Sequence, residues 1–100
     1  NGKLTVSENV ADLGGIAAAL EAAKKEEDFS AEEFFTNFAR IWRMKARTEY
    51  MQLLASVDVH APGKLRTNVQ LPNFDEFFET FDVKEGDGMW RAPEDRVIIW

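Results

Sequence analysis

Two carboxylates near the start of the chain have a spacing that could support chemistry. Glu8 and Asp12 are four residues apart, which on a helix places both side chains on one face, one turn apart. The helix that would carry them is unusually apolar, because no charged residue occurs between Asp12 and Glu21. A buried carboxylate without a partner is very costly, so we expect both groups to pair with a metal ion, a histidine or an arginine.

The only histidine of the chain lies in a second segment rich in functional groups. His60 follows Asp58 and precedes Pro62-Gly63, which fits the middle of a type II turn, and Arg66 comes soon after. A lone histidine is more often an ordinary structural residue. Its place in a loop, beside an acid, a fixed turn and an arginine, favours a role in chemistry.

The first segment resembles a motif of the neprilysin-like zinc metallopeptidases, the family that includes bacterial oligopeptidase O. Residues 8–15 read Glu-Asn-Val-Ala-Asp-Leu-Gly-Gly, and the family pattern is Glu-Asn-x-Ala-Asp-x-Gly-Gly. In that family the Glu is the third zinc ligand, after two histidines of an upstream His-Glu-x-x-His helix, and the Asp orients one of those histidines. The resemblance implies that Glu8 is a ligand of Zn²⁺ and that Asp12 serves catalysis through a zinc-binding histidine.

The second segment resembles the family pattern Asp-x-His-x-Pro-x-x-x-Arg. There the His stabilises the oxyanion of the tetrahedral intermediate, the Asp supports the His, and the Arg hydrogen-bonds a backbone carbonyl of the substrate. The resemblance implies that His60 is catalytic, that Asp58 supports it and that Arg66 binds substrate. Residues 37–42, Asn-Phe-Ala-Arg-Ile-Trp, match a third family pattern, and the terminal Trp100 is also shared.

The catalytic centre implied by this resemblance is incomplete in the sequence. The 100 residues contain no His-Glu-x-x-His, and His60 alone cannot supply the two imidazoles that a catalytic zinc site needs. The chain also begins with Asn1 rather than methionine. We therefore expect residues 1–100 to be the C-terminal part of the catalytic domain of a zinc endopeptidase that hydrolyses oligopeptides. Alone it should be inactive and bind zinc weakly or not at all.

The composition of the chain restricts which partners and which cellular compartment are expected. The formal net charge of −6 argues against nucleic acid or an anionic membrane as a partner, because either would need a basic face. No apolar run approaches the roughly 20 residues of a membrane span. The chain has no cysteine, and Val97 stands where the animal ectoenzymes of the family have one. That departure points to a bacterial member, with the cytoplasm favoured over the cell surface.

The elements that position these groups are expected to be helices, so the fold class is mainly α, the C-terminal helical portion of a gluzincin-type catalytic domain. Ser7, Ser30 and Asn73 are candidate N-caps, and Ser30 with Glu33 forms a capping box. Residues 67–71 are expected to be extended or a loop. Four helices are predicted, over about Glu8 to Glu26, from Ser30 to the basic residues at Arg40 to Arg47, over Thr48 to Val57, and from Asn73 onward.

The first predicted helix has one large and one small apolar face. One face carries the large residues Leu13, Ile16 and Leu20. The other carries small residues such as Gly15 and Ala19 and continues the face on which Glu8 and Asp12 lie. In an excised chain the small face would lose its cover. We therefore predict self-association or marginal stability.

Another class of function stays open, a free-standing acidic helical protein-interaction module whose Phe-rich helices form a docking surface. For such a module, replacing Glu8, Asp12 or His60 by alanine would be near neutral, whereas the peptidase interpretation requires each of them. A catalytically dead relative of the family is a third possibility. The retained acidic pair, His60 and Arg66 argue against it.

Overall fold

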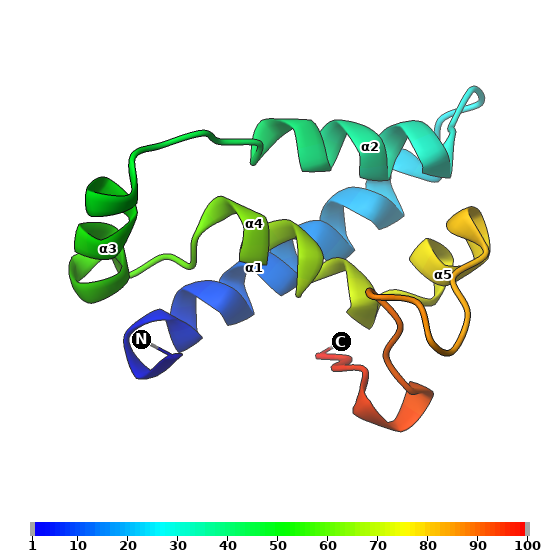
Figure 1. Cartoon of the computed structure of the whole chain (residues 1–100). Coiled ribbons are helices and arrows are strands. Elements are labelled where there is room, and N and C mark those ends of the chain that lie inside the picture. The colour runs from blue at the N-terminus through cyan, green and yellow to red at the C-terminus, as the bar shows by residue number, and fades with distance from the viewer. Residues whose placement is uncertain (1, 100) are drawn as a thin grey trace.

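The computed structural model describes residues 2–99, which form helices joined by turns and loops (Figure 1). Two short 3-10 turns, η1 (Leu71–Asn73) and η2 (Pro93–Asp95), accompany the α-helices. No strand occurs between residues 2 and 99, and the prediction of a mainly α fold is confirmed. The α-helices described are, in chain order, α1 (Gly2–Ala23), α2 (Ala31–Ile41), α3 (Thr48–Val57), α4 (Gly63–Asn68) and α5 (Asp75–Phe81).

The core lies where α1, α2 and α5 meet. Ile16 and Leu20 of α1 pack with Phe35 of α2 and with Phe77 and Phe78 of α5. The rings meet edge to face, with centroids 5.6 Å apart for Phe35–Phe77 and 5.7 Å apart for Phe77–Phe78. Such pairs add about 1 kcal/mol each beyond the area they bury. These phenylalanines are therefore core residues, and they pack α1 against α2 and α5.

Helix α1 is displaced toward the N-terminus relative to the prediction. It begins at Gly2 and ends at Ala23, so the predicted start near Glu8 and end at Glu26 are wrong. Ser7 is an exposed residue inside the helix and not its N-cap. Residues 3–6 contain no helix breaker, and the buried Thr5 accepts a hydrogen bond from the Asn9 side chain one turn later, at 3.3 Å. Glu8 therefore lies on an established helical turn rather than at a frayed end.

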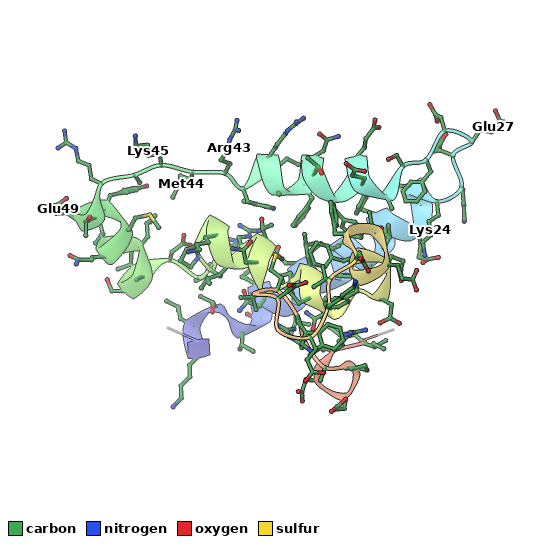
Figure 2. The ribbon with its side chains drawn as sticks, turned by 45° about the vertical axis from the view of Figure 1, so that its right-hand side comes forward. Lys24, Glu27, Arg43, Met44, Lys45 and Glu49 are labelled. Carbon is green, nitrogen blue, oxygen red and sulfur yellow. The ribbon has the colours of Figure 1, made fainter. Side chains whose placement is uncertain are left out.

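Helix α2 begins where the sequence predicted. The Ser30 side chain accepts a hydrogen bond from the Glu33 backbone N–H at 3.2 Å, the N-cap geometry expected of this pair. Its end differs, because α2 stops at Ile41 and residues 43–47 form an extended connection. Figure 2 shows Arg43 and Lys45 on this connection, directed away from the helices. Arg40 therefore lies in the last turn of α2, as predicted, whereas Arg43, Lys45 and Arg47 follow the helix.

Helix α3 has its predicted bounds but not a buried side. None of its residues is buried, and Tyr50 and Leu53 are 48% and 58% exposed. It stands at one end of the molecule, at the far end of the connection that follows α2 (Figure 1). No helix in residues 2–99 is long and apolar enough to cross a membrane.

Residues 62–73 are more helical than the sequence indicated. Pro62 is the N-cap of α4, and its carbonyl accepts from the backbone N–H groups of Leu65 and Arg66 at 2.9 and 3.0 Å. The predicted type II turn at Pro62-Gly63 is wrong. The fixed φ of proline suits a helix start as well as a turn, which is why this pair was ambiguous. Residues 67–71, expected to be extended or a loop, are helical at both ends, and only Val69 and Gln70 form a turn between α4 and η1.

Asn73 does not cap the last helix. Helix α5 begins at Asp75 with Phe74 at the N-cap position and no side-chain cap. The buried Asn73 side chain instead accepts from the Arg91 guanidinium and from the Val97 backbone N–H, the latter at 2.9 Å. It thereby fastens the C-terminal segment to the helices. The family match at Trp100 lies outside the described residues.

Candidate functional site

The structure brings the two chemically interesting segments together. Helix α1 provides Glu8 and Asp12 from one face, as their spacing predicted. The loop after α3 provides Asp58 and His60, and the first turn of α4 provides Arg66. All five candidate residues thus face a single region between α1 and the segment 58–66, where each contacts at least one of the others.

Asp12 and Arg66 are the most tightly joined pair of this region. Nε and Nη2 of Arg66 donate to the two carboxylate oxygens of Asp12 at 2.7 and 2.8 Å. Paired hydrogen bonds between a guanidinium and a carboxylate are among the strongest that side chains form. The expectation that a carboxylate on this helix needs an arginine, a histidine or a metal is met for Asp12 by Arg66.

His60 lies between two carboxylates. Its Nδ1 is 3.1 Å from Oδ1 of Asp58, and its Nε2 is 3.4 Å from Oε2 of Glu8. An ionised carboxylate only accepts hydrogen bonds, so the network places a proton on the Nδ1 that faces Asp58. The other ring nitrogen, Nε2, faces the Glu8 carboxylate.

Asp58 is held by the backbone as well as by the imidazole. Its carboxylate accepts from the backbone N–H of His60 at 3.0 Å, a local turn that fixes both residues. This backbone hydrogen bond, followed by the one to the His60 ring, lowers the pKa of Asp58 below its usual value of 3.8. Asp58 is therefore ionised at neutral pH and suited to orient the histidine.

Trp42 is a site residue that the sequence analysis did not single out. Its indole ring lies under the guanidinium of Arg66, with Cζ 3.7 Å from the ring centroid. The indole covers one face of the guanidinium, whereas the hydrogen bonds to Asp12 lie in the guanidinium plane, so the two contacts together fix its orientation. Trp42 ends the third family pattern, and that match could have pointed to it. An aromatic stripe on a helix, however, is usually interpreted as part of the core.

A hollow of about 340 Å³ adjoins His60 and Arg66. Most of its wall is apolar, and Arg43 and Asp58 line it together with these two polar side chains. Such a cavity can receive an apolar side chain while polar groups hold its backbone. The lining includes Ile41, Trp42, Met44, Met51, Leu54 and Pro62.

The residues present fit one ligand of a catalytic zinc site and not a complete set. Such sites use three protein ligands drawn from His, Glu, Asp and Cys. Among residues 2–99, no group of three or more such side chains is arranged to hold a metal ion. The Glu8 side chain is 43% exposed beside His60 and can face ligands contributed by another part of a longer protein.

Comparisons with known proteins identify the family of this chain. The family model described as Peptidase family M13 matches residues 1–97. The chain belongs to peptidase family M13. A neutral endopeptidase of Lactococcus lactis subsp. lactis is 62% identical over 100 residues, all of this chain and 16% of that protein. Human neprilysin is 34% identical over 113 aligned residues, which cover all of this chain and 15% of that protein.

The name of a third relative specifies zinc as the metal of that protein. A Streptococcus gordonii protein whose name describes it as a zinc metalloproteinase is 97% identical over 34 residues, 34% of this chain and 6% of that protein. No solved structure matches the chain. The resemblance to the neprilysin-like metallopeptidases is confirmed, and this M13 chain spans about one sixth of the length of the curated relatives it matches, such as 16% of the Lactococcus protein.

Proposed function

We propose that this chain is the C-terminal part of the catalytic domain of a zinc-dependent endopeptidase that hydrolyses oligopeptides. The observation that carries the proposal is the pairing of the two segments, His60 with Glu8 and Arg66 with Asp12, 54 positions apart in the second case. Membership of family M13 and the zinc named in a relative support the metal. The peptidase then needs two histidines and a general base from the rest of the protein.

Glu8 supplies a carboxylate ligand to the metal ion. When bound, Zn²⁺ polarises a carbonyl and lowers the pKa of water, which are the requirements of peptide hydrolysis. Asp12 uses one lone pair of each oxygen for Arg66, and each oxygen retains another. It can therefore also accept the ring N–H of a zinc-binding histidine, which is the orienting role we assign to it.

His60 stabilises negative charge on the carbonyl oxygen of the scissile bond. Because Nδ1–H is directed to Asp58, only the imidazolium form can also donate from Nε2. The ionised Asp58 carboxylate compensates the charge of that imidazolium and holds the ring plane. A pre-oriented donor of this kind is most effective where charge develops during the reaction.

Arg66 holds the backbone of the substrate. A guanidinium has five N–H donors, and Asp12 engages two of them, so donors on Nη1 and Nη2 remain for a peptide carbonyl. The Trp42 ring and the Asp12 carboxylate leave the guanidinium little freedom to turn. The apolar hollow beside it can take a neighbouring side chain of the same peptide.

The burial of several phenylalanines argues against the alternative of a helical interaction module. That module needs its Phe-rich helices as an exposed surface, but Phe35, Phe77 and Phe78 are buried against one another and α1. The bacterial cytoplasm remains our prediction for the compartment, on the ground that Val97 stands where the animal ectoenzymes of the family have a cysteine.

The test is metal-dependent hydrolysis by the full-length parent. The purified parent should cleave an internally quenched oligopeptide, lose that activity when a chelator removes the metal, and regain it when Zn²⁺ is returned. The 100-residue chain alone, assayed beside it, should release no product. Hydrolysis that survives complete metal removal, or hydrolysis by the 100 residues alone, would refute the proposal.

A further inference from the structure

Gly63 lies midway between His60 and Arg66 and packs directly against the backbone of Trp42. A Cβ atom at Gly63 would overlap the carbonyl oxygen of Trp42, and it would be 3.4 Å from the carbonyl carbon. A backbone carbonyl at a helix end cannot swing away as a flexible side chain can. By contrast, a Cβ at Gly15 or Gly88 would meet no atom within 4 Å.

The backbone conformation does not explain the glycine. Among the described glycines only Gly86 has a positive φ, so Gly63 adopts a conformation open to any residue. Gly63 is also the first residue of α4, where alanine is the better helix former. The contact with Trp42 is therefore the feature of this position that requires the absence of a side chain.

The same contact decides where Arg66 lies. The Arg66 backbone N–H donates to the Pro62 carbonyl at 3.0 Å, so Gly63 and Arg66 belong to one helical turn. Trp42 touches both ends of that turn, through its carbonyl at Gly63 and through its ring at Arg66. Moving α4 away from Trp42 would pull the guanidinium off the ring or away from Asp12, or both.

We propose that Gly63 is a positioning residue of the peptidase, which acts through Arg66. Its missing side chain lets α4 approach Trp42 closely enough for the guanidinium to stack on the indole and bind Asp12 together. This inference rests on the proposed function, since it assigns to Gly63 an effect on peptide binding by Arg66. It predicts that the smallest possible addition, one methyl group, disturbs substrate binding more than metal binding.

The test uses the full-length parent with Gly63→Ala, and with Gly88→Ala as a matched control. Gly63→Ala should raise KM for an oligopeptide by about tenfold or more, because misplacement by even 1 Å is costly in a positioned site. Zinc content should stay near that of the wild type, and the melting temperature should fall no further than that of the Arg66→Ala parent, which loses the same ion pair. Gly88→Ala adds the same methyl group in open space and should leave KM unchanged.

A double-mutant cycle separates positioning from a general loss of structure. In an Arg66→Ala parent, adding Gly63→Ala should raise KM no further, because the residue it positions is already gone. An equal KM increase in both backgrounds, a wild-type KM for Gly63→Ala, or failure of that variant to fold would each overturn the inference. A wild-type parent that hydrolyses no peptide would instead overturn the proposed function itself.

Discussion

Arg66 and Asp12 form a bidentate ion pair that joins α4 to α1. The two hydrogen bonds measure 2.7 and 2.8 Å, and the side chains are only 15% and 20% exposed. Neither group could be solvated fully if the other were removed. The pair therefore serves the fold as well as the site, because it sets the distance between the helix that carries Glu8 and the loop that carries His60.

Removing Arg66 should destabilise the chain. Arg66→Ala leaves the Asp12 carboxylate half-sheltered and unpaired, and should lower the free energy of unfolding by about 2 kcal/mol. Arg43→Ala, which removes an exposed arginine from the connection after α2, should change it by no more than about 0.5 kcal/mol. Urea unfolding of the 100-residue chain, followed by far-UV circular dichroism, measures both. Equal losses in the two variants would contradict the role of the ion pair.

The carboxyl group of Asp58 should have a pKa below its usual value. Since folding lowers the Asp58 pKa from 3.8, the folded form binds this proton more weakly than the unfolded form. Its contribution to stability is therefore present above about pH 3.8 and is lost as the pH falls through the folded pKa. A carboxyl NMR titration checks the direction of the pKa shift.

His60→Ala should raise the Asp58 pKa only part of the way to 3.8, because the hydrogen bond from the backbone N–H of residue 60, the larger cause of the shift, remains. A full return would mean that the imidazole dominates.

Glu8 should matter for the metal, and Glu21, a second glutamate on the same helix, should not. In the full-length parent, Glu8→Gln keeps the shape of the side chain but removes its charge, and loss of a ligand should lower zinc affinity by tenfold or more, about the scale known for zinc-site partners. Glu21→Gln makes the same change in an exposed pair with Lys24 and should retain zinc. Metal content by atomic absorption after dialysis distinguishes them. Full zinc in the Glu8→Gln parent would exclude Glu8 as a ligand.

The features that sequence could predict here are local ones. The N-cap at Ser30 depends on two residues three apart, and the structure has that hydrogen bond. The spacing of Glu8 and Asp12 likewise depends only on helical geometry. Their assembly with residues 58–66 became an expectation only through resemblance to a family.

The errors arise where distant contacts outweigh local preference. Helix α4 is a short polar segment whose position depends on Trp42 and Asp12, neither of which a local pattern contains. Asn73 precedes α5 as a cap would, but Arg91 and Val97 use its side chain instead. Trp42 ends an apolar stripe with helical spacing, a pattern typical of core residues, but its ring lies against the site residue Arg66.

Ser30 and Ser7 provide a direct comparison of a real and an apparent N-cap. Ser30→Ala should lower the free energy of unfolding of the 100-residue chain by about 1 kcal/mol, because the Glu33 N–H loses its acceptor. Ser7→Ala should be neutral or slightly stabilising, because Ser7 is exposed within α1 and alanine is the better helix former. Thermal or urea unfolding of the two variants measures the difference. A larger loss for Ser7→Ala would indicate that α1 begins near Glu8 after all.

The small-residue face of α1 should make the isolated chain associate. Gly15, Ala19 and Ala22 are exposed, so no other part of residues 2–99 covers the face that they share. Close helix–helix contact through that face would bury it, and we expect the sedimentation coefficient of the 100-residue chain to rise with concentration. Ala19→Lys places a charge in such a contact and should keep the chain monomeric. Ala46→Lys adds the same charge on the exposed connection after α2 and should not prevent association. Association that persists equally in both variants would assign it to another surface, such as the exposed side chains of α3.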